Sequence, residues 1–112
     1  MILLIGGAGQ GKLDYALEKT GYGMEQVART PEEARTRPIF AGLEQWPELD
    51  ENELLAANPD VILICDEVGC GVVPMDKEER AWREQVGRTC CRLAERAAAV
   101  YRVTCGLGVR LK

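Results

Sequence analysis

The feature that most constrains the fold is a glycine-rich stretch that directly follows the first apolar run. The run covers residues 1–5, and the sequence GGAGQGKL follows it at 6–13. An apolar run that meets glycines predicts a strand ending in a tight turn, and the amphipathic segment 12–20 predicts a helix after it. The spacing of Gly6, Gly11 and Lys12 is that of the phosphate-binding loop of nucleotide-binding proteins. We therefore expect a nucleoside triphosphate to bind at this turn.

Each part of the loop has an expected role in holding phosphate. Small residues allow backbone N–H groups to converge on an anion, and Lys12 would reach the β and γ oxygens. The positive end of the following helix favours the same anion. The predicted nucleotide-binding residues are Gly6, Gly7, Ala8, Gly9, Gln10, Gly11, Lys12 and Leu13. Because such a loop contacts only phosphates, it does not distinguish ATP from GTP.

Leu13 departs from the motif, which has Ser or Thr at this position. The missing hydroxyl is the one that ligates Mg²⁺, so the phosphate-binding half of the motif is present and the metal-binding half is not. The alternative interpretation is a glycine-rich turn between a strand and a helix, with an ordinary surface lysine.

A second candidate site follows the most apolar strand of the chain, predicted over 61–65. Its unbroken apolar sequence is typical of a strand buried on both faces of a parallel sheet. Asp66 and Glu67 come next, where a carboxylate beside a phosphate loop can hold Mg²⁺ and a second can position or deprotonate a nucleophile. We therefore predict Asp66 as a metal ligand, and Lys12 and Glu67 as catalytic residues. The alternative is that Asp66 caps a turn and Glu67 is solvated.

The rest of the chain predicts further helices and strands. A brief helix starts at Thr30-Pro31, a short strand covers 39–41, a helix covers 50–57, and a structured loop covers 68–75. Asp76 caps a long helix, and a last strand covers 100–105, followed by a tail. The long helix buries a stripe formed by Trp82, Val86, Cys90, Leu93 and Ala97. The result is a single α/β domain over 1–112, a small P-loop nucleotide-binding fold with a mostly parallel sheet flanked by helices. The sheet has three main strands besides the short strand 39–41.

Composition excludes several functions. The net charge of -4 gives no basic surface for nucleic acid. The first apolar run is too short for a membrane span or a signal peptide, so we expect a cytoplasmic protein with no membrane partner. The five cysteines include no C-x-x-C pair and the chain has no histidine, so we expect small buried side chains rather than a zinc site.

The sequence EVGCGVVP at 67–74 carries a resemblance to a known family. Further matching positions are Ile5 to Ala8, Gly11-Lys12, Arg37-Pro38, Gly87-Arg88, Leu93-Ala94, Gly106 and Leu111-Lys112. In order and spacing they resemble the bifunctional adenosylcobinamide kinase / adenosylcobinamide-phosphate guanylyltransferase family of cobalamin biosynthesis.

The resemblance implies a P-loop fold, often assembled as a trimer. It implies an enzyme that phosphorylates the aminopropanol hydroxyl of adenosylcobinamide, a corrinoid, and then transfers GMP from GTP to that phosphate. In the family the second step passes through a guanylylated histidine. Because this chain contains no histidine, that covalent route is not open to it.

The chain also departs from the family elsewhere. Family members are considerably longer, and the middle of the family sequence, with its acidic strand end, is missing here. The family usually has Asn where this chain has Asp66, Asn-Gln where it has Cys90-Cys91, and Pro where it has Gly108. We hypothesise that Asp66 replaces the missing acidic residue.

Three functions stay open at this stage. The first is a reduced nucleotide-dependent kinase that uses ATP or GTP with Mg²⁺. The second is a degenerate relative that binds a nucleotide or corrinoid, or regulates a full-length partner, without turnover. The third is a protein that keeps only the fold. Uncovered sheet edges in so short a domain would favour a homo-oligomer.

Overall fold

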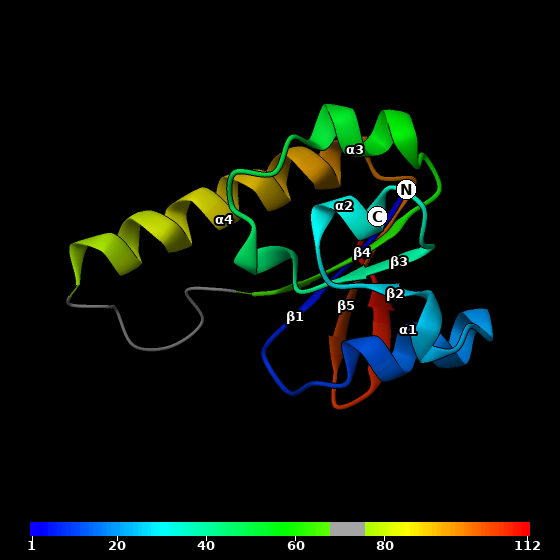
Figure 1. Ribbon diagram of the computed structural model, residues 1–112. Coiled ribbons are helices and arrows are strands. Elements are labelled where there is room, and N and C mark those ends of the chain that lie inside the picture. The colour runs from blue at the N-terminus through cyan, green and yellow to red at the C-terminus, as the bar shows by residue number, and fades with distance from the viewer. Residues whose placement is uncertain (68–75) are drawn as a thin grey trace.

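The computed structural model describes residues 1–67 and 76–112 (Figure 1). Within these ranges a six-stranded sheet has the order β2-β3-β4-β1-β5-β6. Its strands are β1 (Ile2–Gly6), β2 (Val27–Ala28), β3 (Ile39–Ala41), β4 (Ile62–Asp66), β5 (Ala99–Thr104) and β6 (Leu107–Arg110). All neighbouring pairs are parallel except β5 and β6. The predicted α/β fold with a mostly parallel sheet is confirmed.

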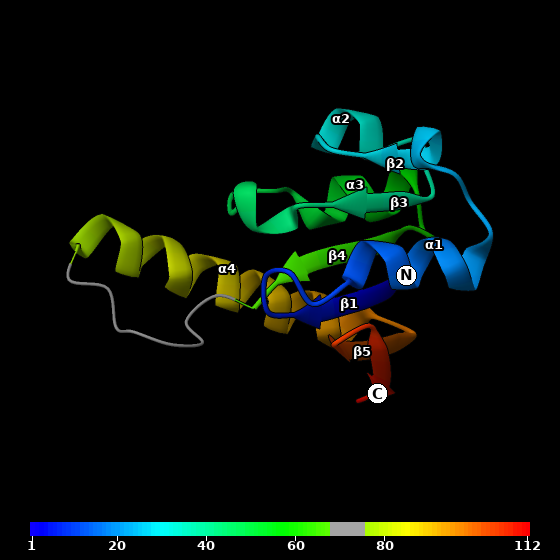
Figure 2. The ribbon, with the colours of Figure 1, turned by 90° about the horizontal axis from the view of Figure 1, so that it is seen from below.

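Helices cover both faces of the sheet. They are α1 (Lys12–Thr20), α2 (Pro31–Ala34), α3 (Glu51–Ala57) and α4 (Lys77–Arg96), with 3-10 turns at Met24–Gln26 and Leu43–Gln45. Figure 1 shows α1 on one side of the sheet and α2, α3 and α4 on the other. The turned view in Figure 2 shows β2, β3, β4, β1 and β5 in sequence across the sheet, with α4 extending beyond it.

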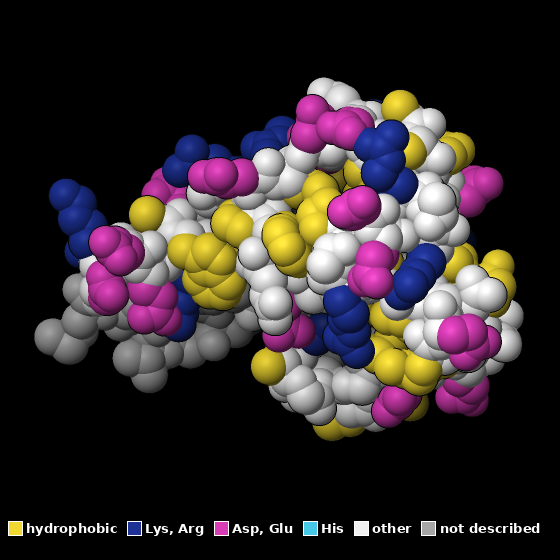
Figure 3. Space-filling model, viewed as in Figure 1, with side chains coloured by type: hydrophobic (Ala, Val, Ile, Leu, Met, Phe, Trp, Pro, Cys, Tyr) yellow, Lys and Arg dark blue, Asp and Glu magenta, His cyan; other side chains and the backbone are white. Residues whose placement is uncertain are grey.

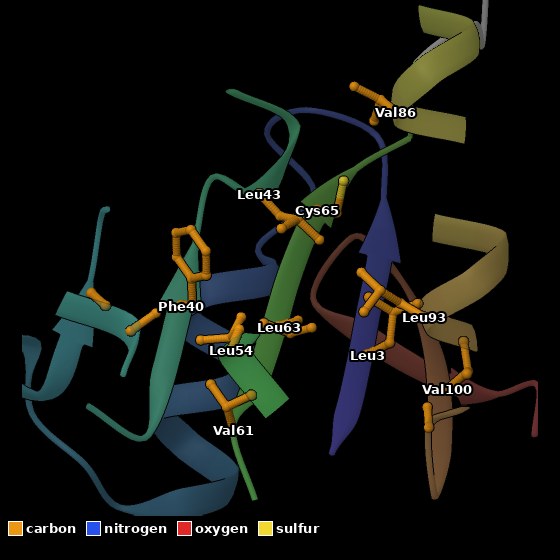
Figure 4. Close-up of a cluster of buried hydrophobic side chains, with 13 residues drawn as sticks. Leu3, Phe40, Leu43, Leu54, Val61, Leu63, Cys65, Val86, Leu93 and Val100 are labelled. Atoms are coloured by element: carbon orange, nitrogen blue, oxygen red, sulfur yellow. The ribbon is translucent and has the colours of Figure 1, made fainter. Parts of the chain in front are cut away.

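The two central strands, β1 and β4, are buried on both faces. Leu3 and Leu63 are register partners on the face covered by α3 and α4, and Leu4 and Ile64 are partners on the α1 face. All four side chains are at most 4% exposed. Figure 4 shows the larger cluster, where side chains of β1, β3, β4 and β5 pack with those of the helices. The unbroken apolar sequence of β4 is explained by this double burial.

Helix starts follow the predicted caps. The side chain of Thr30 accepts from the N–H of Glu33 at 3.2 Å, and Asp76 accepts from the N–H of Glu78 at 2.8 Å. The predicted stripe of α4 also faces the core, since Val86, Leu93 and Ala97 are buried and Trp82 and Cys90 are partly buried. Capping and periodicity therefore position the helices as expected.

Several expectations are corrected. The described residues form six strands, two more than the three main strands and the short strand 39–41 that the sequence predicts. The additional strands are β2, which has only two residues, and β6, which lies where the sequence predicts a tail. The bounds of β4 and β5 differ by one residue from those predicted. Cys65 is buried as expected, but Cys91 and Cys105 are exposed, so burial does not explain them. The predicted loop 68–75 lies outside the described residues.

Charged side chains of both signs are mixed over the face seen in Figure 3. Among the residues that the structure describes, no helix combines the length and apolar character needed to cross a bilayer.

Candidate phosphate-binding site

The predicted phosphate loop connects β1 to α1, and two of its glycines have a clear steric reason. A Cβ on Gly6 would lie 2.4 Å from the carbonyl oxygen of Val103. Gly11, which precedes α1, has a φ of 84°, a left-handed conformation that favours glycine. The loop therefore depends on glycine at both ends of the G-x-x-x-x-G spacing.

Lys12 is the first residue of α1, and its side chain folds back beneath the loop. Its Nζ donates to the carbonyl oxygens of Gly6 at 3.0 Å and Gly7 at 2.7 Å, and lies 2.7 Å from Oδ1 of Asp66. These three partners match the three N–H groups of an ammonium. Only 5% of the Lys12 side chain is exposed, and a charge so buried requires this pairing. Lys12 thus links the start of the loop to Asp66 at the end of β4.

Asp66 reaches Lys12 because of the sheet register. Gly6 and Asp66 are partners across the parallel pair of β1 and β4, so the loop and the carboxylate lie at the same edge of the sheet. The Asp66 side chain is 38% exposed, and its backbone N–H donates to Oε1 of Glu44 at 2.9 Å. The two predicted groups, Lys12 and Asp66, are in direct contact, and a second carboxylate stands beside them.

Glu67 lies next to Arg102 of β5, with which it forms an ion pair. Its backbone N–H donates to the carbonyl oxygen of Gly6 at 2.7 Å, which ties β4 to the start of the loop. Glu67 does not line the cleft described below. Its catalytic role stays a prediction.

A cleft of about 500 Å³ opens beside the loop. It is lined by residues 9–14, Arg29, Ala41, Gly42, Glu44 and Asp66, among others. Arg29 and Glu44 were missed in the sequence analysis. The available signal was positional, because both follow the carboxyl ends of parallel strands, β2 and β3, where ligands bind in open α/β sheets.

A hydrogen-bonded contact joins the tip of the loop to the turn between β5 and β6. Oε1 of Gln10 accepts from the N–H of Cys105, and the backbone oxygen of Gln10 accepts from the N–H of Gly106, both at 2.8 Å. This contact is not predictable from the sequence without β6, which carries no clear local signal. The hairpin therefore helps to set the conformation of the phosphate loop.

The fit to Mg²⁺ rests on two carboxylates, Asp66 and Glu44. Magnesium sites in nucleotide-binding proteins commonly use one or two carboxylates, with phosphate oxygens and water completing the shell. Leu13 lines the cleft and offers no oxygen donor. Within the described residues, no group of three or more acidic or cysteine side chains is placed to hold a metal ion. Phosphate oxygens and water would therefore have to supply the remaining ligands.

A larger hollow of about 1100 Å³ lies beside α2 and α3, with Trp46, Pro47 and Leu54 among its lining residues. It contains no residue of the phosphate loop. Gln45 lines both this hollow and the cleft, so the two are neighbours.

Comparison with known proteins identifies the family. Residues 43–111 match the family described as "Cobinamide kinase / cobinamide phosphate guanyltransferase". The chain belongs to this family. The match starts after the phosphate loop and includes β4, α4, β5 and β6, so family membership rests on a different part of the chain from the P-loop motif.

Two curated relatives are similar to part of this member of the cobinamide kinase family. The bifunctional adenosylcobalamin biosynthesis protein CobU of Salmonella typhimurium is 42% identical over 52 residues, which cover 46% of this chain and 29% of that protein. The protein of the same name from Escherichia coli K12 is 34% identical over 77 residues, which cover 65% of this chain and 42% of that protein. The chain therefore spans less than half of the curated relatives that it matches.

Proposed function

We propose that this chain binds a nucleoside triphosphate, ATP or GTP, in the cleft beside the loop 6–13 and acts in the kinase step of cobalamin biosynthesis. The observation that carries the proposal is the buried ammonium of Lys12, held 2.7 Å from Asp66 at the edge of the sheet where the loop opens. Phosphoryl transfer depends chiefly on positioning and on neutralising charge. Lys12, the loop amides and the nearby Arg29 are the groups suited to that task.

Magnesium would be held by Asp66, with Glu44 as the second carboxylate of the cleft. Bound there, it would neutralise charge on the phosphates. Because Asp66 also pairs with Lys12, the carboxylate contributes to both the metal site and the position of the lysine. A nucleotide in the cleft would give Lys12 a phosphate partner in place of the loop carbonyl oxygens.

We assign the corrinoid to the larger hollow beside α2 and α3. Its size suits a bulky substrate, and Gln45 connects it to the cleft, so a hydroxyl on the bound molecule could approach the phosphate. Trp46, which is 37% exposed, supplies an apolar ring there. On titration with cobinamide we expect quenching of Trp fluorescence that a Trp46→Phe variant loses and a Trp82→Phe variant keeps; the reverse pattern would contradict the assignment.

The second candidate is a nucleotide-binding relative without turnover. It is favoured by Leu13, which lacks the metal-ligating hydroxyl, and by the pairing of Glu67 with Arg102 outside the cleft. Guanylyl transfer through a histidine is not proposed, because the chain has none. A cytoplasmic location and a single domain over 1–112 stay predictions from the sequence.

The test is calorimetric titration of ATP and GTP, each with and without Mg²⁺, into the wild type and Lys12→Met. We expect Lys12→Met to weaken binding by at least about tenfold, since it removes a charge-assisted phosphate contact. Lys19→Met is the matched control, because Lys19 lies on the same helix outside the cleft, over the ring of Tyr15. If wild type binds neither nucleotide at millimolar concentration, the proposal is wrong.

Turnover separates the two candidates once binding is established. Incubation with cobinamide and the nucleotide that binds, followed by mass spectrometry of the corrinoid, would show a phosphorylated product for the kinase. Binding without product would support the accessory protein.

A further inference from the structure

The observation concerns two thiols on elements that are distant in sequence. Sγ of Cys65, in β4, lies 3.4 Å from Sγ of Cys90, in α4. Cys65 is fully buried in the core cluster that α4 covers, and Cys90 packs against that cluster from the helix. Figure 4 shows Cys65 on β4 among the side chains of this core. The nucleotide proposal does not use either thiol.

We propose that Cys65 and Cys90 form a reversible disulfide that joins β4 to α4. A disulfide requires an S–S separation of about 2.05 Å, so the sulfur atoms need to approach by only about 1.4 Å. The end of α4 that carries Cys90 is anchored nearby by buried Val86 and Leu93, which keeps the thiol opposite β4.

The two cysteines differ in how accessible they are to solvent, and this difference determines which thiol reacts first with an oxidant. Cys90 is partly exposed and Cys65 is not, so a small oxidant reaches Cys90 first. The hydrogen bond with Cys65 also lowers the pKa of Cys90, which favours its thiolate. Cys90 is therefore the attacking thiol, and Cys65 is the resolving thiol.

The reaction balances with a hydroperoxide as the oxidant. The Cys90 thiolate attacks one oxygen of hydrogen peroxide, the O–O bond breaks, and Cys90 sulfenic acid and hydroxide form. The Cys65 sulfur then attacks the sulfenic sulfur, the S–O bond breaks, and water leaves with the proton of Cys65. The two thiols lose two electrons in total, and the peroxide gains them. A dithiol reductant reverses the change by thiol–disulfide exchange.

The neighbouring cysteines provide matched controls. Cys91 is adjacent to Cys90 in sequence but is exposed on α4, and Cys105 is exposed in the β5–β6 turn. A variant in which Cys70, Cys91 and Cys105 are replaced by Ser keeps only the proposed pair. In the same background, Cys90→Ser removes the attacking thiol without touching the buried strand. A third variant carries Ser at positions 70, 90 and 105 and keeps Cys65 and Cys91. It tests whether a thiol at the adjacent position of α4 can also form a disulfide with Cys65.

The experiment is peroxide oxidation of the pair-only variant, followed by alkylation and non-reducing peptide mapping. We expect the loss of both free thiols, one linked peptide pair that contains Cys65 and Cys90, and full reversal by dithiothreitol. Closing a loop of 25 residues should raise Tm by roughly 10 °C in the oxidised form. Neither Cys90→Ser variant should form an intramolecular disulfide.

Two results would overturn the proposal. One is that peroxide oxidises Cys90 while Cys65 remains a free thiol, which is detected as alkylation of Cys65 once the oxidised protein is unfolded. The other is a Cys90-Cys91 disulfide in the wild type, or a Cys91 link to Cys65 in the third variant. If the pair-only variant does not fold, the same mapping on wild-type protein gives the same decision, because each cysteine lies in a distinct sequence context.

Discussion

At the scale of single residues, the phosphate loop depends on close approaches between backbone segments. Gly6 lies so near the Val103 carbonyl oxygen that a Cβ would sit 2.4 Å from it. The neighbouring atom belongs to the backbone of β5, which is paired on both sides within the sheet, and it has little freedom to move. Gly6 is therefore required by the packing of the sheet, whether or not a ligand is bound.

Gly6→Ala should lower the free energy of unfolding by about 2 kcal/mol or more, because β1 and β5 must separate to admit the methyl group. Gly87→Ala is the matched control. Gly87 is exposed inside α4 with no atom near its would-be Cβ, so alanine there should raise stability by roughly 0.5–1 kcal/mol. Urea unfolding followed by circular dichroism measures both. Equal effects of the two substitutions would contradict the steric argument.

Leu13→Ser tests whether the cleft lacks only a metal-ligating hydroxyl. Leu13 lines the cleft directly after Lys12, where the motif has Ser or Thr. If Asp66 and Glu44 already hold Mg²⁺, the added hydroxyl should strengthen magnesium-dependent nucleotide binding by about tenfold, a typical value for one favourable ligand contact. Calorimetric titration with and without Mg²⁺ gives the ratio.

Leu13→Ala is the control for the loss of the leucine side chain. It should leave the magnesium dependence as in the wild type. If Leu13→Ser and Leu13→Ala behave alike, the metal-ligand hypothesis for Asp66 is not supported.

At the scale of elements, the least predictable feature is the hairpin between β5 and β6. Its two-residue turn consists of Cys105 with φ 52° and Gly106 with φ 75°. Positive φ at both positions is the type I′ turn that joins twisted antiparallel strands, and Asn-Gly is its usual sequence. Cys-Gly does not carry that signal, so the sequence predicts a tail after residue 105.

Cys105→Asn should therefore raise the free energy of unfolding by roughly 0.5–1 kcal/mol, because Asn tolerates the left-handed region better than other non-glycine residues. The exposed position gives the new side chain room, and the backbone N–H can still donate to Gln10. Cys105→Val is the opposing control. As a β-branched residue it should destabilise the turn, and thermal unfolding of the three proteins should rank them Asn, Cys, Val.

Prediction from sequence succeeded where one local rule decides the outcome. Three features depend only on neighbouring residues: the apolar run of β4, the caps at Thr30 and Asp76, and the spacing of three and four residues along α4. Each is confirmed. For the site, the contact of Lys12 with Asp66 follows from a motif and a parallel strand end. Arg29, Glu44 and the Gln10 contacts depend on which strands are neighbours in the sheet, and no local pattern encodes that order. β2 was missed because two residues cannot display an alternation.

At the scale of the whole molecule, β6 leaves an apolar row uncovered at the edge of the described sheet. The exposed side chains are Leu107 at 71%, Val109 at 60% and Leu111 at 54%. Alternate residues of an extended segment lie on one face, so the three form a row. An edge strand with an apolar face favours pairing with another chain, and a second copy supplies a self-complementary partner by antiparallel pairing.

We expect the protein to sediment as an oligomer at micromolar concentration, and a variant with Leu107→Lys and Val109→Lys to sediment as a monomer. Both side chains are exposed, so the change should alter the free energy of unfolding of the monomer by no more than about 0.5 kcal/mol each. Met24→Lys, at another exposed apolar site, is the control that should keep the oligomer. A monomeric wild type would contradict the expectation.

The position of β1 in the sheet has a consequence for synthesis on the ribosome. β1 pairs with β4 and β5, and Ile2 lies opposite Ile62 on one side and Ala99 on the other. β1 leaves the exit tunnel before either neighbour, so it has no partner strand until β4 has followed it and only one until β5 has followed. The phosphate loop follows β1 and is hydrogen-bonded to the β5–β6 turn through Gln10, so it is complete only when the β5–β6 hairpin has emerged. Nascent chains that end before this hairpin should not be able to hold nucleotide, so the site should mature only after β6 has been synthesised.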